Sequence, residues 1–181
     1  MKTLEREKSF KLWDQWWNEM QDEWFKIEVL QDYSGEDKGP SLDAWLTGDK
    51  EKSIQLMVDD YNKEWVKMCQ KSPAAKRRFH VVRKPYTPYL EWEIELYKRV
   101  NIPLAGEIVH LVPAEKVEHL NIPDGDVMIF DQKRVARAYY TPEGKVEKMD
   151  FYEKSTDDIS SFLHIRAELP KHAALVVTTR K

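Results

Sequence analysis

The sequence predicts an α+β fold, and three observations carry this prediction. Apolar residues recur at helical spacing in two stretches of the first half, whereas alternation of period two dominates much of the second half. Strands and helices do not follow each other in the regular order of a doubly wound fold. We therefore expect an antiparallel sheet with a β-meander in the C-terminal half, packed with an N-terminal aromatic helix, a long central helix and a C-terminal helix.

Length and composition fit one soluble domain. The chain has 181 residues, of which 41% are hydrophobic and 34% charged, and no repeat or linker divides it. We expect a single domain over residues 1–181. The net charge of −3 gives no overall attraction to nucleic acid or anionic membranes. No apolar run approaches the length of a spanning helix, and the N-terminus MKTLEREKSF is charged, so we expect a cytoplasmic protein.

Three helices are predicted before residue 75. The first has an unusually aromatic face, formed by Phe10, Trp13, Trp17 and Met20. Ser41 is expected to cap a short helix that ends at Gly48. A long helix is then expected from Lys50 to Gln70, because its apolar residues step by four and three positions, and Pro73 ends it.

The segment 88–100 is ambiguous between helix and strand. Its sequence LEWEIEL alternates apolar residues with Glu, as a half-buried strand would, but Thr87 and Pro88 form a good helix start. In a strand, the Glu side chains would line one face, whereas in a helix they spread around it. We predict a helix from Pro88 to Val100.

Strands are expected around this segment and in a meander beyond it. The alternation predicts strands at residues 25–29, 77–84 and 107–112, followed by a short helix from Pro113 to His119. The meander consists of DVMIFD, RVARAYY and KVEKMDFY, joined by Gln-Lys and Pro-Glu-Gly turns. Ser155 is expected to cap the last helix, which Pro170 ends or kinks.

The sequence carries no recognisable cofactor or metal motif. Its five histidines form no i, i+4 pair and have no cysteine companions, and it has neither a phosphate-binding Gly-rich loop nor a nucleophile elbow. Cys69 is the single cysteine, which excludes an intramolecular disulfide, and its place in a helical pattern predicts a buried, unreactive thiol. We expect no cofactor and no bound metal, and catalysis has little support.

The stretch from Arg78 onward resembles one family. Its motifs are the run Arg78–Val82, Pro85, Tyr89-Leu90 with Trp92-Glu93, Asn101, and Ala105-Gly106-Glu107 before the strand at Ile108. The acidic-aromatic strand from Asp126 to Asp131 extends the similarity. These motifs are similar to those of a bacterial family of uncharacterised proteins, often encoded beside helix-turn-helix regulators of the phage-repressor type. The resemblance implies a regulatory setting and supplies no reaction, substrate or cofactor.

The same stretch supplies the residues that we expect to form a site. One helical ridge carries Tyr89, Glu93, Tyr97 and Asn101. Gly106 would let the backbone turn so that Glu107 approaches this ridge. In the functional interpretation, Glu93, Asn101 and Glu107 form a polar groove that binds a ligand or a partner's basic side chain, with the two tyrosines as flat contacts. In the structural interpretation, which we favour, Glu93 pairs with an arginine such as Arg78 while Asn101 and Glu107 hold the loop together.

The aromatic N-terminal helix is a second candidate surface. Trp16 lies off the face shared by Trp13 and Trp17, so it is the residue expected to be exposed and to anchor a partner. The alternative is that the helix lies between the sheet and the long helix, which would bury most of its circumference.

Two further features point to binding or cleavage of nucleic acid, but they are weaker than the two candidate surfaces above. Residues 71–84 contain six Lys or Arg and no acid, but no nucleic-acid-binding motif accompanies them, and a solvated face is the simpler interpretation. Asp124, Asp131 and Lys133 are similar to the Pro-Asp and Asp-x-Lys elements of a nuclease family whose carboxylates bind Mg²⁺.

Together these features predict a non-catalytic binding protein of a bacterial regulatory module. Its expected partner is a protein such as a helix-turn-helix regulator, contacted through the groove or the aromatic helix. The alternative is a metal-dependent, toxin-like nuclease that uses Asp124, Asp131 and Lys133. The sequence leaves the partner, the ligand and the oligomeric state open, and no membrane association is expected.

Overall fold

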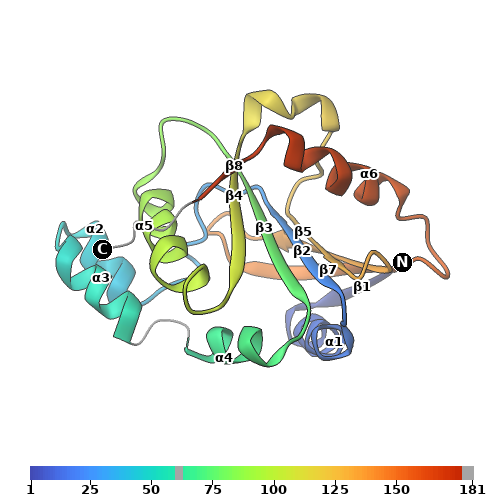
Figure 1. Ribbon diagram of the computed structural model, residues 1–181, viewed down its shortest axis with the longest axis horizontal. Coiled ribbons are helices and arrows are strands. Elements are labelled where there is room, and N and C mark those ends of the chain that lie inside the picture. Colours follow the sequence, from blue (N-terminus) through green and yellow to red (C-terminus); the bar gives the residue numbers. More distant parts are fainter. Residues whose placement is uncertain (60–62, 177–181) are drawn as a thin grey trace.

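Eight strands form one mixed sheet in the computed structural model, which describes residues 1–59 and 63–176 (Figure 1). Their order across the sheet is β1-β7-β6-β5-β2-β3-β4-β8. The strands are β1 (Lys2–Glu5), β2 (Glu23–Glu28), β3 (Ala75–Val82), β4 (Glu107–Pro113), β5 (Asp126–Phe130), β6 (Arg134–Tyr140), β7 (Val146–Glu153) and β8 (Ala174–Leu175). Helices pack on both faces, so the predicted α+β class is confirmed.

The sheet is antiparallel only in part. Strands β5, β6 and β7 form the predicted meander, and β1 pairs antiparallel with β7. Strands β2, β3 and β4 run parallel, which corrects the expectation of an antiparallel sheet. The physical reason is that helical segments connect these three strands, and such a crossover returns the chain to the end of the sheet where the previous strand began.

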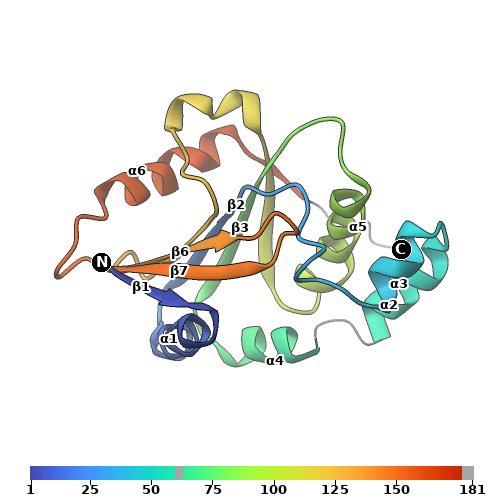
Figure 2. The ribbon, with the colours of Figure 1, turned by 180° about the vertical axis from the view of Figure 1, so that it is seen from behind.

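Helices cover both faces of this sheet. Helices α1 (Arg6–Glu19) and α4 (Lys63–Lys71) lie on one face, and α6 (Ser160–Glu168) lies on the other together with two 3-10 turns at residues 114–116 and 118–120 (Figures 1 and 2). Helices α2 (Pro40–Leu46), α3 (Lys50–Asp59) and α5 (Pro88–Leu96) pack together at one end. Every helix in the described part of the chain is too short or too polar to cross a membrane.

The predicted long helix from Lys50 to Gln70 is replaced by two helices. Helix α3 packs against α2 and α5, whereas α4 packs on the sheet near α1, and their orientations differ (Figures 1 and 2). The predicted apolar stripe is therefore divided, with Ile54 packed against one cluster and Trp65 and Met68 against another, while Val58 is exposed. Tyr61 and its neighbours at 60 and 62 lie outside the described residues.

The helix starts were predicted with mixed success. Thr87 begins α5 as expected, because its Oγ1 accepts the backbone N–H three residues further on at 3.0 Å. Helix α2 begins at Pro40 rather than after a Ser41 cap, since the Ser41 hydroxyl donates to a carbonyl of α3 at 3.0 Å. Helix α6 begins at Ser160, so Ser155 does not cap it.

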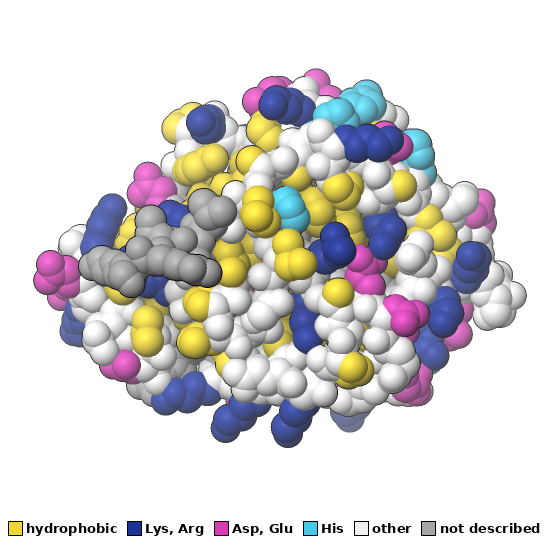
Figure 3. Space-filling view, viewed as in Figure 1, with side chains coloured by type: hydrophobic (Ala, Val, Ile, Leu, Met, Phe, Trp, Pro, Cys, Tyr) yellow, Lys and Arg dark blue, Asp and Glu magenta, His cyan; other side chains and the backbone are white. Residues whose placement is uncertain are grey.

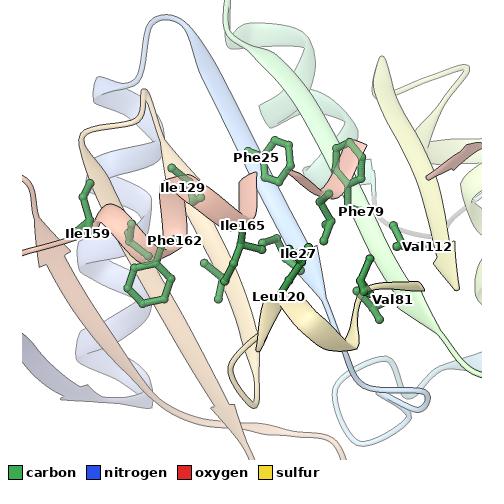
Figure 4. Close-up of a cluster of buried hydrophobic side chains, with 14 of the residues drawn as sticks. Phe25, Ile27, Phe79, Val81, Val112, Leu120, Ile129, Ile159, Phe162 and Ile165 are labelled. Carbon is green, nitrogen blue, oxygen red and sulfur yellow. The ribbon is translucent and has the colours of Figure 1, made fainter. Parts of the chain in front are cut away.

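A continuous apolar core fills the α6 face of the sheet (Figure 4). Phe25 of β2 stacks on Phe79 of β3 with ring centroids 4.6 Å apart, and Phe162 and Ile165 of α6 pack over the same layer. Each such buried side chain stabilises the fold by roughly 1.5–3 kcal/mol. Because this face supplies so much apolar burial, the opposite face can tolerate the charged groups described below.

Candidate functional site

A cavity of about 370 Å³ lies between the sheet and the helices α1, α4 and α5. It is on the face of the sheet that α1 and α4 cover, which is called the inner face below. Trp13 of α1, Trp65 of α4 and Leu96 of α5 belong to its walls. Ligand-binding pockets in proteins measure roughly 300 to 1,000 Å³, so the volume suits a small molecule.

The floor of the cavity is charged because β2 and β3 each carry charged residues at alternate positions, and alternate side chains of a strand point to the same face of the sheet. Lys26 and Glu28 project to the inner face of β2, while Arg78 and His80 project to the inner face of β3. Parallel pairing places Lys26 beside Arg78 and Glu28 beside His80. The register of two strands therefore assembles the charged cluster directly.

Arg78 joins carboxylates that come from its two neighbouring strands. Its Nε donates to Glu107 at 2.7 Å, and its guanidinium also donates to Glu28. Glu107 accepts two further hydrogen bonds, from the Asn101 amide at 2.7 Å and from the Trp65 indole N–H at 2.6 Å. The predicted link between Asn101 and Glu107 is present, and Arg78 is held by Glu28 and Glu107.

Lys26 and Asp126 extend the cluster toward β5. The Lys26 ammonium lies 2.6 Å from Glu28 and 3.4 Å from Asp126. Asp126 accepts hydrogen bonds from the hydroxyls of Tyr33 and Tyr140, each at 2.7 Å. Both oxygens of this carboxylate are therefore used within the protein, and the two phenol rings are fixed at the cavity wall.

His80 carries a proton on both ring nitrogens. Nε2 lies 2.7 Å from the Leu30 carbonyl oxygen, which can only accept, so this nitrogen donates. Nδ1 lies 3.0 Å from the Tyr97 hydroxyl, whose own hydrogen is donated to Glu28 at 2.8 Å. Nδ1 therefore donates as well, and the imidazole is positively charged.

Glu93 of α5 is the counter-ion of this imidazolium. Its Oε2 lies 3.3 Å from His80 Nδ1, so Glu93 pairs with a histidine and not with Arg78 as expected. In the described part of the chain Oε2 is buried and accepts no well-aligned hydrogen bond. Each of Glu28, Glu107 and Asp126, in contrast, accepts at least three. Glu93 is thus the least satisfied carboxylate at the cavity floor.

These contacts shift the pKa of three buried groups. Burial alone would lower the pKa of His80, but the carboxylates of Glu93 and Glu28 outweigh it and raise the pKa to about 9. Burial raises the pKa of Glu93, and the His80 charge offsets this only in part. Burial also opposes ionisation of Glu28, yet Arg78 and Lys26 outweigh it and lower the pKa of Glu28. At neutral pH the cluster therefore holds a cationic His80 beside an ionised Glu28.

Aromatic rings form the walls above this floor. The ring of Trp65 lies 6.4 Å from that of Trp13 and 5.3 Å from that of Trp24, centroid to centroid. Elsewhere in the wall, Tyr33 and Tyr140 meet edge to face at 5.3 Å. The cavity therefore combines flat apolar faces with a polar base.

Four predicted site residues line this cavity, namely Arg78, Glu93, Tyr97 and Asn101. Glu107 lies against them through its hydrogen bonds to Arg78 and Asn101. Tyr89 is a step further away, and its hydroxyl donates to the cavity residue Asp37. Beyond Leu96 the ridge continues through a π-helical turn, Tyr97–Asn101, and such turns recur at functional sites.

Trp16 is buried, which corrects its predicted role as an exposed anchor. It is 3% exposed and packs edge to face against Phe130 at 5.8 Å and Phe151 at 5.0 Å. The guanidinium of Arg134 lies over its ring at 5.5 Å. The apolar arc of α1 is wider than one helical stripe because the helix lies directly on the sheet, as the alternative interpretation held.

The residues of the nuclease alternative do not converge. Asp124 precedes β5 and Asp131 follows it, so a strand of roughly 17 Å separates them. The Asp131 carboxylate accepts three backbone N–H groups at 2.7–3.0 Å, from the segment 21–23 that leads into β2. Asp131 therefore organises a turn, and this geometry gives the nuclease alternative no support.

The basic segment 71–84 does not form one face. Arg78 and Lys76 are buried on the inner face, whereas Arg77 projects to the other face and lies 3.1 Å from Glu23. On the face shown in Figure 3, Lys and Arg side chains are spread over much of the surface, and several line its lower edge.

Glu28, His80 and Glu93 are the one group in the described chain with the spacing of a metal site, since their ligand atoms lie within 4.8 Å of one another. The chemistry of the set fits a cation poorly. The His80 nitrogen that would bind it carries a proton, and Glu28 is already paired with Lys26 and Arg78. We therefore assign no metal to this cluster.

Sequence reasoning missed the central members of the cluster, Lys26, His80 and Asp126. The usable signal was charge inside strands that are otherwise apolar. Residues 24–28 read Trp-Phe-Lys-Ile-Glu, and 78–82 read Arg-Phe-His-Val-Val, with polar residues two apart. When helices cover both faces of a sheet, such a polar face becomes a buried polar cluster.

The fold and the cavity define an α+β protein with a charged, aromatic-walled cavity that opens to solvent. The chain belongs to the family described as "Domain of unknown function (DUF6879)", whose model matches residues 11–176. This confirms the resemblance to an uncharacterised family. Among curated proteins the chain has no match.

Proposed function

We propose that this protein binds a small molecule in the cavity and does not transform it. The carrying observation is the set of buried charges under an aromatic-walled cavity of about 370 Å³. Buried ion pairs contribute little stability compared with apolar residues of the same volume. The many charged groups on the inner face of the sheet are therefore better explained by binding than by stability.

Binding is favoured over catalysis because most of the polar groups at the cavity floor are occupied. Glu28, Arg78 and Asp126 spend their hydrogen bonds on one another and on tyrosine hydroxyls. The one thiol, Cys69, is 1% exposed, and burial raises its pKa to about 12, which suppresses the reactive thiolate. Rigid, mutually satisfied groups suit recognition of a ligand.

The regulatory setting remains part of the proposal. Helices α1 and α4 contribute side chains to the cavity wall and also form part of the outer surface. A bound ligand would therefore alter helices that a partner protein can contact. A helix-turn-helix regulator, as implied by the family resemblance, is the partner that this proposal predicts.

A thermal-shift screen against a broad metabolite panel tests the binding function. Met68 of α4 lines the cavity, whereas its neighbour Lys67 is exposed, so Met68→Trp should obstruct the cavity and Lys67→Trp should not. At about 100 times its Kd, a ligand adds roughly 2.7 kcal/mol to the free energy of unfolding. Compounds that stabilise the wild type and Lys67→Trp, but not Met68→Trp, are expected.

Two results would count against this function. One is a set of hits that stabilise Met68→Trp as much as the wild type, because such compounds bind elsewhere. The other is the absence of hits combined with native mass spectrometry that finds only the bare chain after purification from its own cells.

A further inference from the structure

We infer that the cavity binds an organic cation, with an ammonium or guanidinium group attached to a flat or apolar body. This assignment rests on the proposed binding function and names its ligand class. It follows from three properties of the cavity, namely its net charge, a carboxylate oxygen that accepts no well-aligned hydrogen bond, and the aromatic walls.

The cavity and its floor carry an excess of negative charge. Among the described residues, the buried cluster holds four carboxylates and three cations, namely Glu28, Glu93, Glu107 and Asp126 with Lys26, Arg78 and His80. Asp14 adds one more carboxylate to the lining, and Glu36 is balanced by Arg6 at 2.6 Å. Bringing a cation into this site is therefore favourable, and bringing an anion is not.

The two cationic side chains described in the cavity lining are already paired with carboxylates. Lys26 lies between Glu28 and Asp126, and Arg78 lies between Glu28 and Glu107. An incoming carboxylate or phosphate would have to break these buried pairs, which typically costs several kcal/mol. An anionic ligand therefore has no ready partner in the described part of the cavity.

Glu93 provides the acceptor that a cation requires. It lines the cavity and is 5% exposed, and its Oε2 has the His80 imidazole 3.3 Å away but accepts no well-aligned hydrogen bond in the described structure. A ligand N–H donor would complete the hydrogen bonding of this carboxylate. The nearby Asn101 side-chain oxygen is a second acceptor, because the amide nitrogen is used by Glu107.

The walls suit the body of such a ligand. Trp13 and Trp65 present rings to the cavity, and tryptophan is the strongest ring partner for an organic cation. The protein already uses this contact at the floor, where the Arg78 guanidinium lies 5.6 Å from the Trp24 ring centre and 5.5 Å from that of Tyr97. A flat or apolar amine would therefore find both stacking faces and a counter-charge.

A matched series of probes separates charge from shape. The compounds 2-phenylethylamine, 2-phenylethanol and phenylacetate share a phenyl body and are cationic, neutral and anionic at neutral pH. Isothermal titration of the full chain with each is expected to rank the amine first, at least tenfold tighter than the alcohol, with phenylacetate weakest. Choline and its uncharged carbon analogue 3,3-dimethylbutanol form a second pair for which the same order is expected.

Variants that each remove one negative charge test where the cation binds. Asp14→Asn removes a cavity carboxylate from the exposed face of α1, where folding is not at risk, and should weaken amine binding two- to fivefold. Glu7→Gln makes the same charge change on the same helix outside the cavity and should leave the affinity unchanged. Glu93→Gln should weaken amine binding tenfold or more, provided that its circular dichroism and melting curve show a folded protein.

The possible outcomes are distinguishable. Equal or tighter binding of the alcohol or of phenylacetate overturns the cation assignment while leaving the binding function intact, and so does a lack of amine binding at millimolar concentration. Equal effects of Asp14→Asn and Glu7→Gln would also overturn it. A short peptide with an internal lysine that binds more tightly than the free amines would identify the cation as a partner's side chain.

Discussion

His80 on β3 and Glu93 on α5 form a buried ion pair, with Nδ1 and Oε2 3.3 Å apart, that joins strand β3 to the helix beside the cavity. His80 is 0% and Glu93 5% exposed. Because apolar residues of the same volume would stabilise the fold at least as well as a buried ion pair, its presence is better explained by the site than by the stability of the fold.

The His80 pair makes stability depend on pH. The pKa of His80 is about 9 in the folded protein and about 6.5 in an unfolded chain, so the folded state binds the proton more tightly. This contribution is fully present below pH 6.5 and is lost as the pH rises through 9. We expect the free energy of unfolding from urea titrations to fall by up to about 3 kcal/mol across this window.

Two variants check the assignment of that pH dependence. His80→Gln should flatten the fall between neutral and alkaline pH, whereas His164→Gln, on the exposed face of α6, should keep it. An unchanged pH profile in His80→Gln would show that another group is responsible.

Arg78 and Arg77 are adjacent, yet we expect opposite results when each is replaced by methionine. Arg78→Met leaves Glu28 and Glu107 without their shared cation and should reduce the free energy of unfolding by roughly 3–5 kcal/mol. Arg77 is 45% exposed and pairs with Glu23, so Arg77→Met should cost about 1 kcal/mol or less. Similar losses in both variants, measured by urea denaturation, would contradict the buried cluster.

Trp16→Ala should destabilise the protein without changing its association. Removal of a fully buried indole that contacts Phe130 and Phe151 is expected to cost roughly 3–5 kcal/mol. Gln15→Ala on the exposed side of α1 serves as the control and should change stability by less than about 0.5 kcal/mol. Light scattering is expected to give the same molar mass for all three proteins, and a change in mass confined to Trp16→Ala would restore its interface role.

Asp131 should act as a structural residue. Asp131→Asn keeps a residue type that tolerates the local φ of 51° but weakens the acceptance of three N–H groups, so a loss of roughly 1–2 kcal/mol is expected. Asp124→Asn should be nearly neutral, because its backbone carbonyl makes the contact with Arg137. Magnesium-dependent nuclease activity that disappears in both variants would reverse this interpretation.

Local signals were enough to predict much of the site. Thr87 and Pro88 specify the start of α5, and the spacing of four places Glu93, Tyr97 and Asn101 along one ridge. Gly106 has a φ of 70°, which is the backbone freedom that the prediction assigned to it before Glu107. These features depend on neighbours within a few residues, so they can be derived from one sequence.

The pairing of strands that are distant in the sequence could not be predicted from such local signals. The parallel register that brings Glu28 to His80 depends on crossovers of tens of residues, and the edge strands β1 and β8 are four and two residues long, too short for a periodic signal. Trp16 was misplaced for a related reason. The width of the buried arc on α1 is set by the sheet beneath it, which the helix sequence alone does not encode.

The most direct test of the account is a crystal structure of the protein with 2-(4-bromophenyl)ethylamine, in which the anomalous signal of bromine locates the ligand. We predict a bromine peak in the cavity near Trp13 and Trp65, with the ammonium group within hydrogen-bonding distance of the Glu93 carboxylate. A peak outside the cavity, or an amine directed away from Glu93, would contradict the assignment of this cavity as a site for organic cations.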